Sequence, residues 1–175
     1  LLVCDIGGGT TDLTLVEVAE QNGELILQRA AVGDHLLVGG DNMDLALAHS
    51  VAQLFEGKGL TLDPWQSVSL WHSCRNAKES LLSETGPDVH TISVPGRSSR
   101  LIGGLVSVNV ERAQATDLLL NGFFSVAPLS DRPARARASG FREIGLPYEA
   151  DTGITRHLAA FLNQSLAGSS LTHVL

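Results

Sequence analysis

The chain has 175 residues, of which 43% are hydrophobic and 18% charged, so it can bury a sizeable core and is not disordered by composition. Its 12 basic and 19 acidic side chains give a net charge of -7, which argues against a broad nucleic-acid or anionic-membrane surface. No apolar run approaches the roughly 18 residues of a transmembrane helix, and no basic-then-apolar pattern in the given sequence predicts a signal peptide. The length predicts one domain or one compact lobe of a larger domain.

The first residues predict a piece cut from a longer chain. Residue 1 is not Met, and Leu1–Asp5 reads at once as a buried strand, whereas natural chain ends are usually polar and frayed. Cys4 and Cys74 lack a CxxC neighbour and a His at ligand spacing. We therefore expect both to be reduced core thiols of a cytoplasmic protein.

Three antiparallel strands are predicted at the start of the chain. The apolar run Leu1–Asp5 and the alternating segment Leu13–Val18 flank a glycine turn, a pattern typical of a hairpin. Asn22-Gly23 is a strong turn signal because both residues tolerate positive φ, and Glu24–Val32 follows as the third strand.

Helices and two further strands follow. Apolar spacing predicts a helix from Asp41 or Asn42 to about Phe55, and Asp63-Pro64 predicts the start of a second helix that ends at Leu82 or Ser83. The remaining expected elements are strands over His90–Val94 and Leu105–Val110 with a Gly/Ser/Arg turn between them, helices over Ala113–Phe124 and Thr152–Asn163, and a loop over Ser130–Gly140. The tail Ser165–Leu175 has no clear pattern, and residues 126–175 are expected to be a linker and a C-terminal helical segment.

The segment Asp5-Ile6-Gly7-Gly8-Gly9-Thr10-Thr11-Asp12 carries the clearest chemical signal. Glycines let the backbone turn sharply and approach a ligand, and successive N–H groups in such a turn form a donor cluster suited to phosphate. Thr10 adds a hydroxyl, while the ionised Asp5 and Asp12 could hold the water shell of Mg²⁺ or orient an attacking water. The alternative is a plain hairpin turn. The pattern is not a P-loop, since it lacks GK[ST] and a following helix.

Two further segments select a family. Asp5–Asp12 resembles the second phosphate loop of the actin-like ATPases. The run Gly33–Asp44 resembles the "GDTHLGGEDFD" segment of DnaK-type (70-kDa heat-shock) chaperones, and Ser73–Ser83 resembles their "ACERAKRTLSS" helix. The resemblance covers about residues 1–125 and implies an α/β fold. This would be the second lobe of an actin-like (ribonuclease H-like) ATPase domain, with core strands and first helix over 1–57 and an inserted α+β subdomain over about 58–125.

The resemblance implies ATP or ADP with Mg²⁺ as cofactors. Phosphates would bind Gly7, Gly8, Gly9 and Thr10, and the catalytic residues would be Asp5, Thr10 and Asp12, with Asp5 and Asp12 meeting the metal through water. Gly39 and Gly40 would line the phosphate and ribose side, and Lys78 would reach the nucleoside. The alternatives are a helix-entry turn for Gly39-Gly40 and a solvated lysine for Lys78. Asp34 is expected to be a turn residue.

Departures from the family pattern fall on the adenine side. Arg75 stands where the family has glutamate, Glu79 where it has the arginine that stacks on adenine, and Leu82 where it has serine. Because a carboxylate cannot replace a stacked guanidinium, adenine binding should be weaker or differently built. Ile144-Gly145-Leu146-Pro147 is a poor stand-in for the family's late "GGSTRIP" loop.

Three functions remain open. The first is the ATP-binding lobe of a DnaK-like chaperone, completed by lobe I of the same parent chain, with a co-chaperone or client protein as further partner. Lobe I would supply the first phosphate loop and the catalytic lysine, so the chain alone is not expected to be a competent ATPase. The second is a non-hydrolysing, chaperone-like interaction module, and the third is a piece of an actin-like filament protein. Neither nucleic acid nor membrane is an expected partner.

Overall fold

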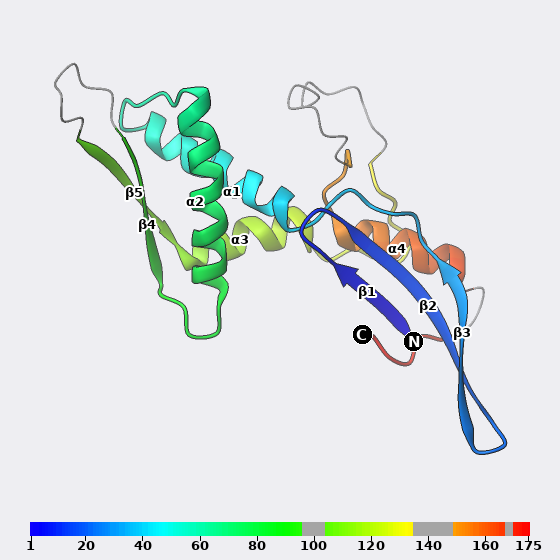
Figure 1. Ribbon diagram of the computed structural model, residues 1–175. Helices are drawn as coiled ribbons and strands as arrows, with labels where there is room; N and C mark the ends of the chain where they lie inside the picture. Colours follow the sequence, from blue (N-terminus) through cyan, green and yellow to red (C-terminus); the bar gives the residue numbers. More distant parts are fainter. Residues whose placement is uncertain (96–103, 135–148, 167–169) are drawn as a thin grey trace. The chain divides into compact units, whose positions relative to one another are not determined.

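The computed structural model describes residues 1–95, 104–134, 149–166 and 170–175 (Figure 1). The chain forms two compact units, one from Leu1–Gly40 with Gly122–Leu175 and the other from Asp41–Asn121. The predicted turn between Pro95 and Leu105 falls almost wholly outside the described residues, as do Ile144–Pro147 and most of the predicted loop Ser130–Gly140. No helix in the described ranges is long and apolar enough to cross a membrane.

The first unit is built on three antiparallel strands in the order β1-β2-β3, as the sequence predicts (Figure 1). They are β1 (Leu2–Ile6), β2 (Thr11–Gln21) and β3 (Glu24–Val32). The β2–β3 turn has φ of 58° at Asn22 and 82° at Gly23, the left-handed pair that the Asn-Gly signal predicts. Leu13 and Leu15 of β2 are buried, so one face of the sheet meets the core.

The last residues of the chain pair with β1. The N–H of Leu2 donates to the carbonyl of His173 at 2.9 Å, and the N–H of Leu175 donates to the carbonyl of Leu2 at 2.8 Å. Leu2 and Val174 form a parallel bridge. Strand β1 is therefore hydrogen-bonded along both edges, a pairing that the tail's weak pattern does not predict.

Helix α4 (Ile154–Ser165) covers the buried face of this sheet (Figure 1). Its Phe161 ring packs against Gly33, where an added Cβ would lie only 3.2 Å from the ring. The helix predicted over Thr152–Asn163 is confirmed, and it packs against the sheet.

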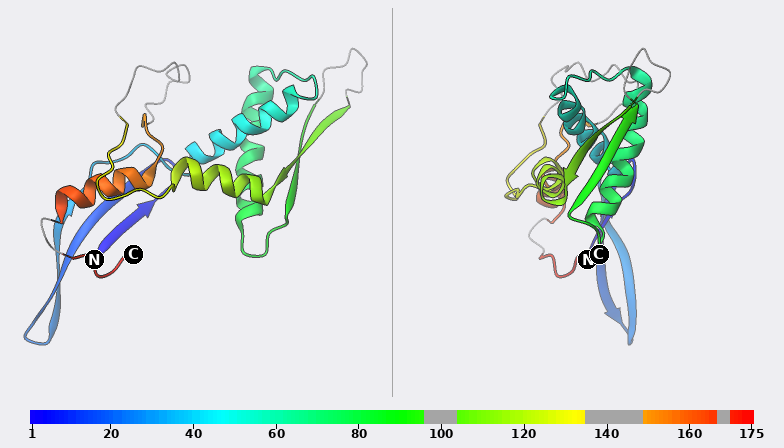
Figure 2. Two further views of the ribbon diagram at one scale, coloured as in Figure 1. Left: turned by 180° about the vertical axis from the view of Figure 1, so that it is seen from behind. Right: turned by 90° about the vertical axis from the view of Figure 1, so that its left-hand side faces the viewer.

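The second unit holds α1 (Gly40–Glu56, from Asp41 onward), α2 (Pro64–Leu82), β4 (Val89–Pro95), β5 (Leu105–Glu111) and most of α3 (Arg112–Phe123). Strands β4 and β5 form an antiparallel pair, and α2 packs along β4 (Figure 2). Asp63 and Gln66 form a capping box at the start of α2, with reciprocal bonds of 2.9 and 2.8 Å. The core of this unit includes Leu47, Val51, Phe55, Leu70, Cys74, Ala77, Leu81, Ile92, Val94, Val108 and Val110.

The predicted element types are confirmed for the strands and helices named above, and their first and last residues differ from the predicted ones by a few positions. Strand β2 is extended at both ends, to Thr11–Gln21. A mixed α/β fold that opens with three antiparallel strands is what the sequence predicts. The predicted domain limits, at about residues 57 and 125, stay a prediction, because compact units and evolutionary lobes need not coincide.

Candidate phosphate-binding loop

The triple-glycine segment links β1 to β2 as a short exposed loop. The N–H of Gly7 donates to the carbonyl of Thr10 at 2.8 Å, which is one hydrogen bond between the two ends of the loop. Gly7, Gly8 and Gly9 are all exposed. Among the described residues only Gly23 and Gly59 are glycines with positive φ, so left-handed backbone is not the reason for glycine in this loop.

A second segment, Leu36–Gly40, packs against this loop from one side. Leu36 and Thr11 exchange backbone hydrogen bonds of 2.9 and 3.1 Å, and the buried Thr11 hydroxyl donates to the Val38 carbonyl at 2.8 Å. The N–H of Gly40 donates to the carbonyl of Gly7 at 3.0 Å. The segment therefore contacts the carbonyl side of the loop.

Gly39 is the point of closest approach. A Cβ at this position would lie 2.6 Å from the carbonyl oxygen of Gly7, 2.7 Å from that of Gly8 and 2.9 Å from the nitrogen of Thr10. A Cβ added to Gly7 would meet nothing nearer than the Thr10 carbonyl at 3.4 Å. Steric exclusion of a side chain is thus much stronger at Gly39 than at the first glycine of the loop.

The loop presents backbone donors on the side away from Gly39. In a trans peptide the N–H points opposite to the preceding carbonyl. Because the carbonyl oxygens of Gly7 and Gly8 lie against Gly39 and Gly40, the N–H groups of Gly8 and Gly9 point outward. Within the described ranges, the N–H groups of Gly8, Gly9 and Thr10 have no acceptor. Such a row of free amides suits a phosphate oxygen.

Two carboxylates flank the loop on one face of the sheet. Asp5 and Asp12 are direct partners in the β1–β2 register, and directly paired side chains lie on the same face about 5 Å apart. Like charges in this position repel, so a cation between them would be stabilising. Oδ1 of Asp12 also lies 2.7 Å from Nδ1 of His35. In the described part of the chain no three His, Cys, Asp or Glu side chains cluster as metal ligands.

Lys78 lies in the second unit, within a charge cluster between α1 and α2. Its Nζ is 2.6 Å from Oδ1 of Asp44, whose side chain is completely buried. Nε of Arg75 lies 3.1 Å from the other oxygen of Asp44, and the same guanidinium pairs with Asp41. The side chain of Lys78 is only 15% exposed, so the lysine that the sequence assigns to the nucleoside has a structural partner as well.

A comparison with known families covers the part of the chain that contains this loop. The family model described as "Hsp70 protein" matches residues 1–126. The chain belongs to the Hsp70 family. The predicted membership is confirmed, and with it the actin-like ATPase fold; the matched residues are those of a chaperone nucleotide-binding domain. Hsp70 domains in general bind nucleotide with Mg²⁺ and work with client proteins or co-chaperones.

An ion pair of this Hsp70 chain with a buried carboxylate was missed from the sequence. Asp151 is 5% exposed and accepts hydrogen bonds from the Nε of Arg156 and the N–H of Gly153, both at 2.8 Å, and from the N–H of Ala134 at 2.7 Å. The Arg156 hydrogen bonds, followed by the backbone donors, hold the pKa of Asp151 well below its usual range. Through this ion pair Arg156 fixes the start of α4, within the helix predicted over Thr152–Asn163.

The thiols of the Hsp70 chain are also placed. Both cysteines are free, with Cys74 fully buried and Cys4 half-buried. Burial, with a smaller contribution from Asp44, raises the pKa of the Cys74 thiol to about 12, and burial likewise raises the pKa of Cys4. Neither thiol is therefore set up as a nucleophile.

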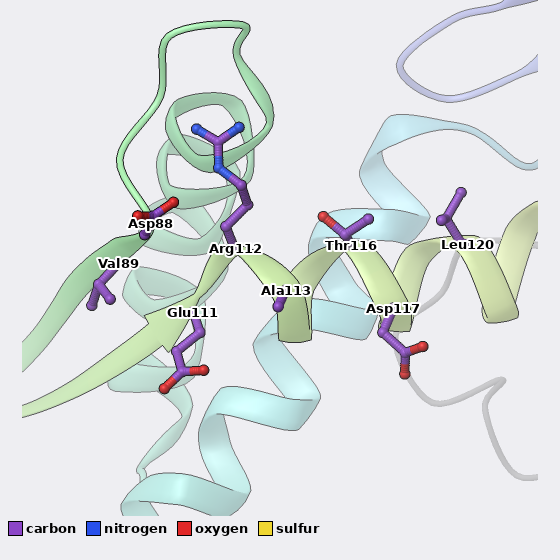
Figure 3. Close-up of a pocket in the computed structure, with 8 residues that line it drawn as sticks. All are labelled: Asp88, Val89, Glu111, Arg112, Ala113, Thr116, Asp117 and Leu120. Carbon is purple, nitrogen blue, oxygen red and sulfur yellow. The ribbon is translucent and has the colours of Figure 1, made fainter.

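The second unit has a depression that is lined by none of the residues that the sequence assigns to nucleotide. It has a volume of about 500 Å³ between the ends of β4 and β5 and α3, lined by Asp88, Val89, Glu111, Arg112, Ala113, Thr116, Asp117 and Leu120 (Figure 3). The Arg112 guanidinium donates to the carbonyls of Ser83, Gly86 and Pro87. The Arg112 guanidinium therefore stabilises the turn that contains these carbonyls, and its donors are already engaged in these hydrogen bonds.

Proposed function

We propose that this chain is the ATP-binding lobe of a DnaK-like chaperone, in which Mg-ATP hydrolysis by the full-length protein drives lobe closure. The observation that carries the proposal is the row of unpaired N–H groups at Gly8, Gly9 and Thr10, next to two carboxylates on one face of the sheet. Donors and acceptors in this arrangement suit a phosphate chain that carries a divalent cation.

Each residue has a distinct part in this proposal. Gly8, Gly9 and Thr10 donate N–H groups to β- and γ-phosphate oxygens, and the Thr10 hydroxyl adds a donor. The N–H of Gly7 is bonded within the loop, so Gly7 contributes through close approach alone. Asp5 and Asp12 orient metal-bound or attacking water as acceptors. Bound Mg²⁺ would supply neutralisation of phosphate charge.

Nucleoside recognition is the part of the proposal in which this chain departs from its family. Lys78 keeps its contact role toward the nucleoside while it neutralises Asp44. The Arg75 cation, which replaces a family glutamate, is held by Asp41 and Asp44. With Glu79 and Leu82 completing the altered face, we expect weaker binding of adenine than is typical of the family.

The partners follow from the same proposal. Lobe I of the parent chain supplies the remaining half of the site, and the chain alone is inactive as an ATPase. A client protein or co-chaperone receives the conformational signal. We propose a cytoplasmic location.

The test is the melting temperature of the full-length protein with Mg-ATP, Mg-ADP and Mg-AMP. A ligand at 100 times its Kd stabilises the folded state by about 2.7 kcal/mol, so ATP and ADP should both raise the melting temperature measurably. AMP should have a much smaller effect because it cannot reach the loop with a β-phosphate. Thr10→Val should reduce the ATP effect and leave the melting temperature without nucleotide nearly unchanged.

A second candidate is a non-hydrolysing interaction module, favoured by the reversed charges at Arg75 and Glu79. In that case neither ATP nor ADP would shift the melting temperature of a well-folded full-length protein. ATP-dependent sedimentation would instead indicate an actin-like filament protein.

A further inference from the structure

The hydrogen bonding of the glycine loop is asymmetric. In an ordinary two-residue hairpin loop, the residues on either side exchange two hydrogen bonds, and the turn needs positive φ at one or both central residues. Here Gly7 donates to the Thr10 carbonyl at 2.8 Å, but Thr10 does not donate back. The carbonyl of Gly7 accepts from the N–H of Gly40 at 3.0 Å, and Gly8 and Gly9 do not have positive φ.

We propose that Gly39 and Gly40 are positioning residues that hold the loop open for phosphate. The N–H of Gly40 donates to the Gly7 carbonyl, and the space that a Cβ on Gly39 would fill lies 2.6 Å from that carbonyl oxygen and 2.9 Å from the nitrogen of Thr10. With the Gly7 carbonyl bonded to Gly40, the hydrogen bond from Thr10 is not formed, and the Thr10 N–H stays available to a phosphate oxygen. This inference rests on the proposed function and goes beyond it, since it gives the two glycines a task that is complete before any nucleotide binds.

The distances explain why position 39 has to be glycine. All three atoms that an added Cβ would meet, at 2.6, 2.7 and 2.9 Å, belong to the backbone of the loop. Backbone atoms cannot rotate aside as the end of a side chain can, so alanine would push segment 38–40 away from the loop. The Gly7 carbonyl would then be free to accept from Thr10, and one of the loop's three donors that lack an acceptor would be lost.

The other end of the segment is anchored by Thr11. Its hydroxyl, fully buried, donates to the Val38 carbonyl at 2.8 Å, immediately before Gly39. Thr11→Val removes this bond with little change in side-chain volume. It should loosen the segment without introducing a clash, which provides a milder variant of the same perturbation.

The experiment compares Gly39→Ala, Thr11→Val and Gly122→Ala in the full-length protein. Gly122 is the matched control, because a Cβ there meets nothing within 4 Å. Amide hydrogen exchange at Thr10 is measured without nucleotide, and binding of Mg-ATP and of inorganic pyrophosphate is measured by calorimetry. We expect rapid exchange of the Thr10 amide in the wild type and slower exchange in Gly39→Ala.

Affinity for both ligands should fall about tenfold in Gly39→Ala, as for the loss of one hydrogen bond to a charged group, and less in Thr11→Val. Gly122→Ala should match the wild type. A protected Thr10 amide in the nucleotide-free wild type would overturn the inference. So would a folded Gly39→Ala variant with wild-type exchange and affinity. If Gly39→Ala does not fold, Thr11→Val decides by the same two readouts.

The two proposals fail separately. A wild type that binds neither Mg-ATP nor pyrophosphate refutes the proposed function, whereas the exchange rate at Thr10 still decides whether Gly39 and Gly40 hold the turn open. A wild type that binds both, with unaffected Gly39→Ala, refutes only the role of the two glycines.

Discussion

Asp12 and His35 are joined by a contact of 2.7 Å between Oδ1 and Nδ1, although 23 positions separate them in the chain. Both side chains are about half exposed, at 49% for Asp12 and 61% for His35. The carboxylate proposed to hold water at the phosphate loop therefore already has a hydrogen-bond donor. This relationship lets the function of Asp12 be tested from two directions.

Removing the charge of Asp12 should damage turnover and leave folding intact. Asp12→Asn in the full-length protein should lower the rate of phosphate release about 10²-fold, the scale for loss of one positioned catalytic group. Steady-state phosphate release measures this effect. Asp34→Asn, at an exposed position nearby, is the control, and equal rates in the two variants would refute the role of Asp12.

Removing the His35 side chain should increase the affinity of the site for Mg²⁺. An exposed pair of this kind contributes up to about 1 kcal/mol, so His35→Ala should free Asp12 and raise the apparent Mg²⁺ affinity by up to about fivefold. A titration of turnover against Mg²⁺ checks this. His49→Ala controls for loss of an exposed imidazole, and a lower Mg²⁺ affinity in His35→Ala would show that His35 supports the site.

Lys78→Met separates structure from ligand binding at α2. The substitution leaves one oxygen of the buried Asp44 without its ion-pair partner, which should lower the free energy of unfolding by about 3 kcal/mol. Chemical denaturation without nucleotide measures this loss. Glu79→Met, on an exposed turn of the same helix, should change stability far less. If stability is unaffected while ATP affinity falls, Lys78 serves the nucleoside alone.

Asp151 should make the free energy of unfolding depend on pH in the acidic range. Because its folded pKa is depressed from 3.8, its contribution is fully present above that value and is lost as the pH falls through the folded pKa. Asp151→Asn should destabilise the protein by about 2 kcal/mol at pH 7, since Arg156 loses its partner. Denaturation from pH 7 to pH 3 should show the gap between wild type and variant narrowing below about pH 4. A constant gap would contradict the assignment.

Local signals account for the parts of the fold that were predicted correctly. Asn22-Gly23 fixes a turn by its own conformational preference, and Asp63 with Gln66 caps a helix within four residues. Contacts between distant segments leave no such signal. The pairing of residues 173–175 with β1 and the hydrogen bond from the Ala134 N–H to Asp151 depend on the folded backbone.

The candidate loop shows the same division. The sequence predicts that glycines, a threonine and two aspartates gather at one turn, and the β1–β2 register places Asp5 opposite Asp12 as a hairpin requires. The sequence could not show that the N–H of Gly7 is bonded internally or that Gly39 is glycine because of the loop beside it. The assignment of these residues to nucleotide stays a prediction.

The double-sided pairing of β1 also bears on how the loop can move. Asp5 belongs to strand β1, which is hydrogen-bonded to β2 along one edge and to the segment ending at Leu175 along the other. A force that a bound ligand exerts on the loop would therefore be transmitted to both neighbouring segments. Local unfolding of residues 173–175 would leave β1 as an edge strand and would make the position of Asp5 less rigid. The segment 173–175 therefore determines how rigidly the first of the two carboxylates is held.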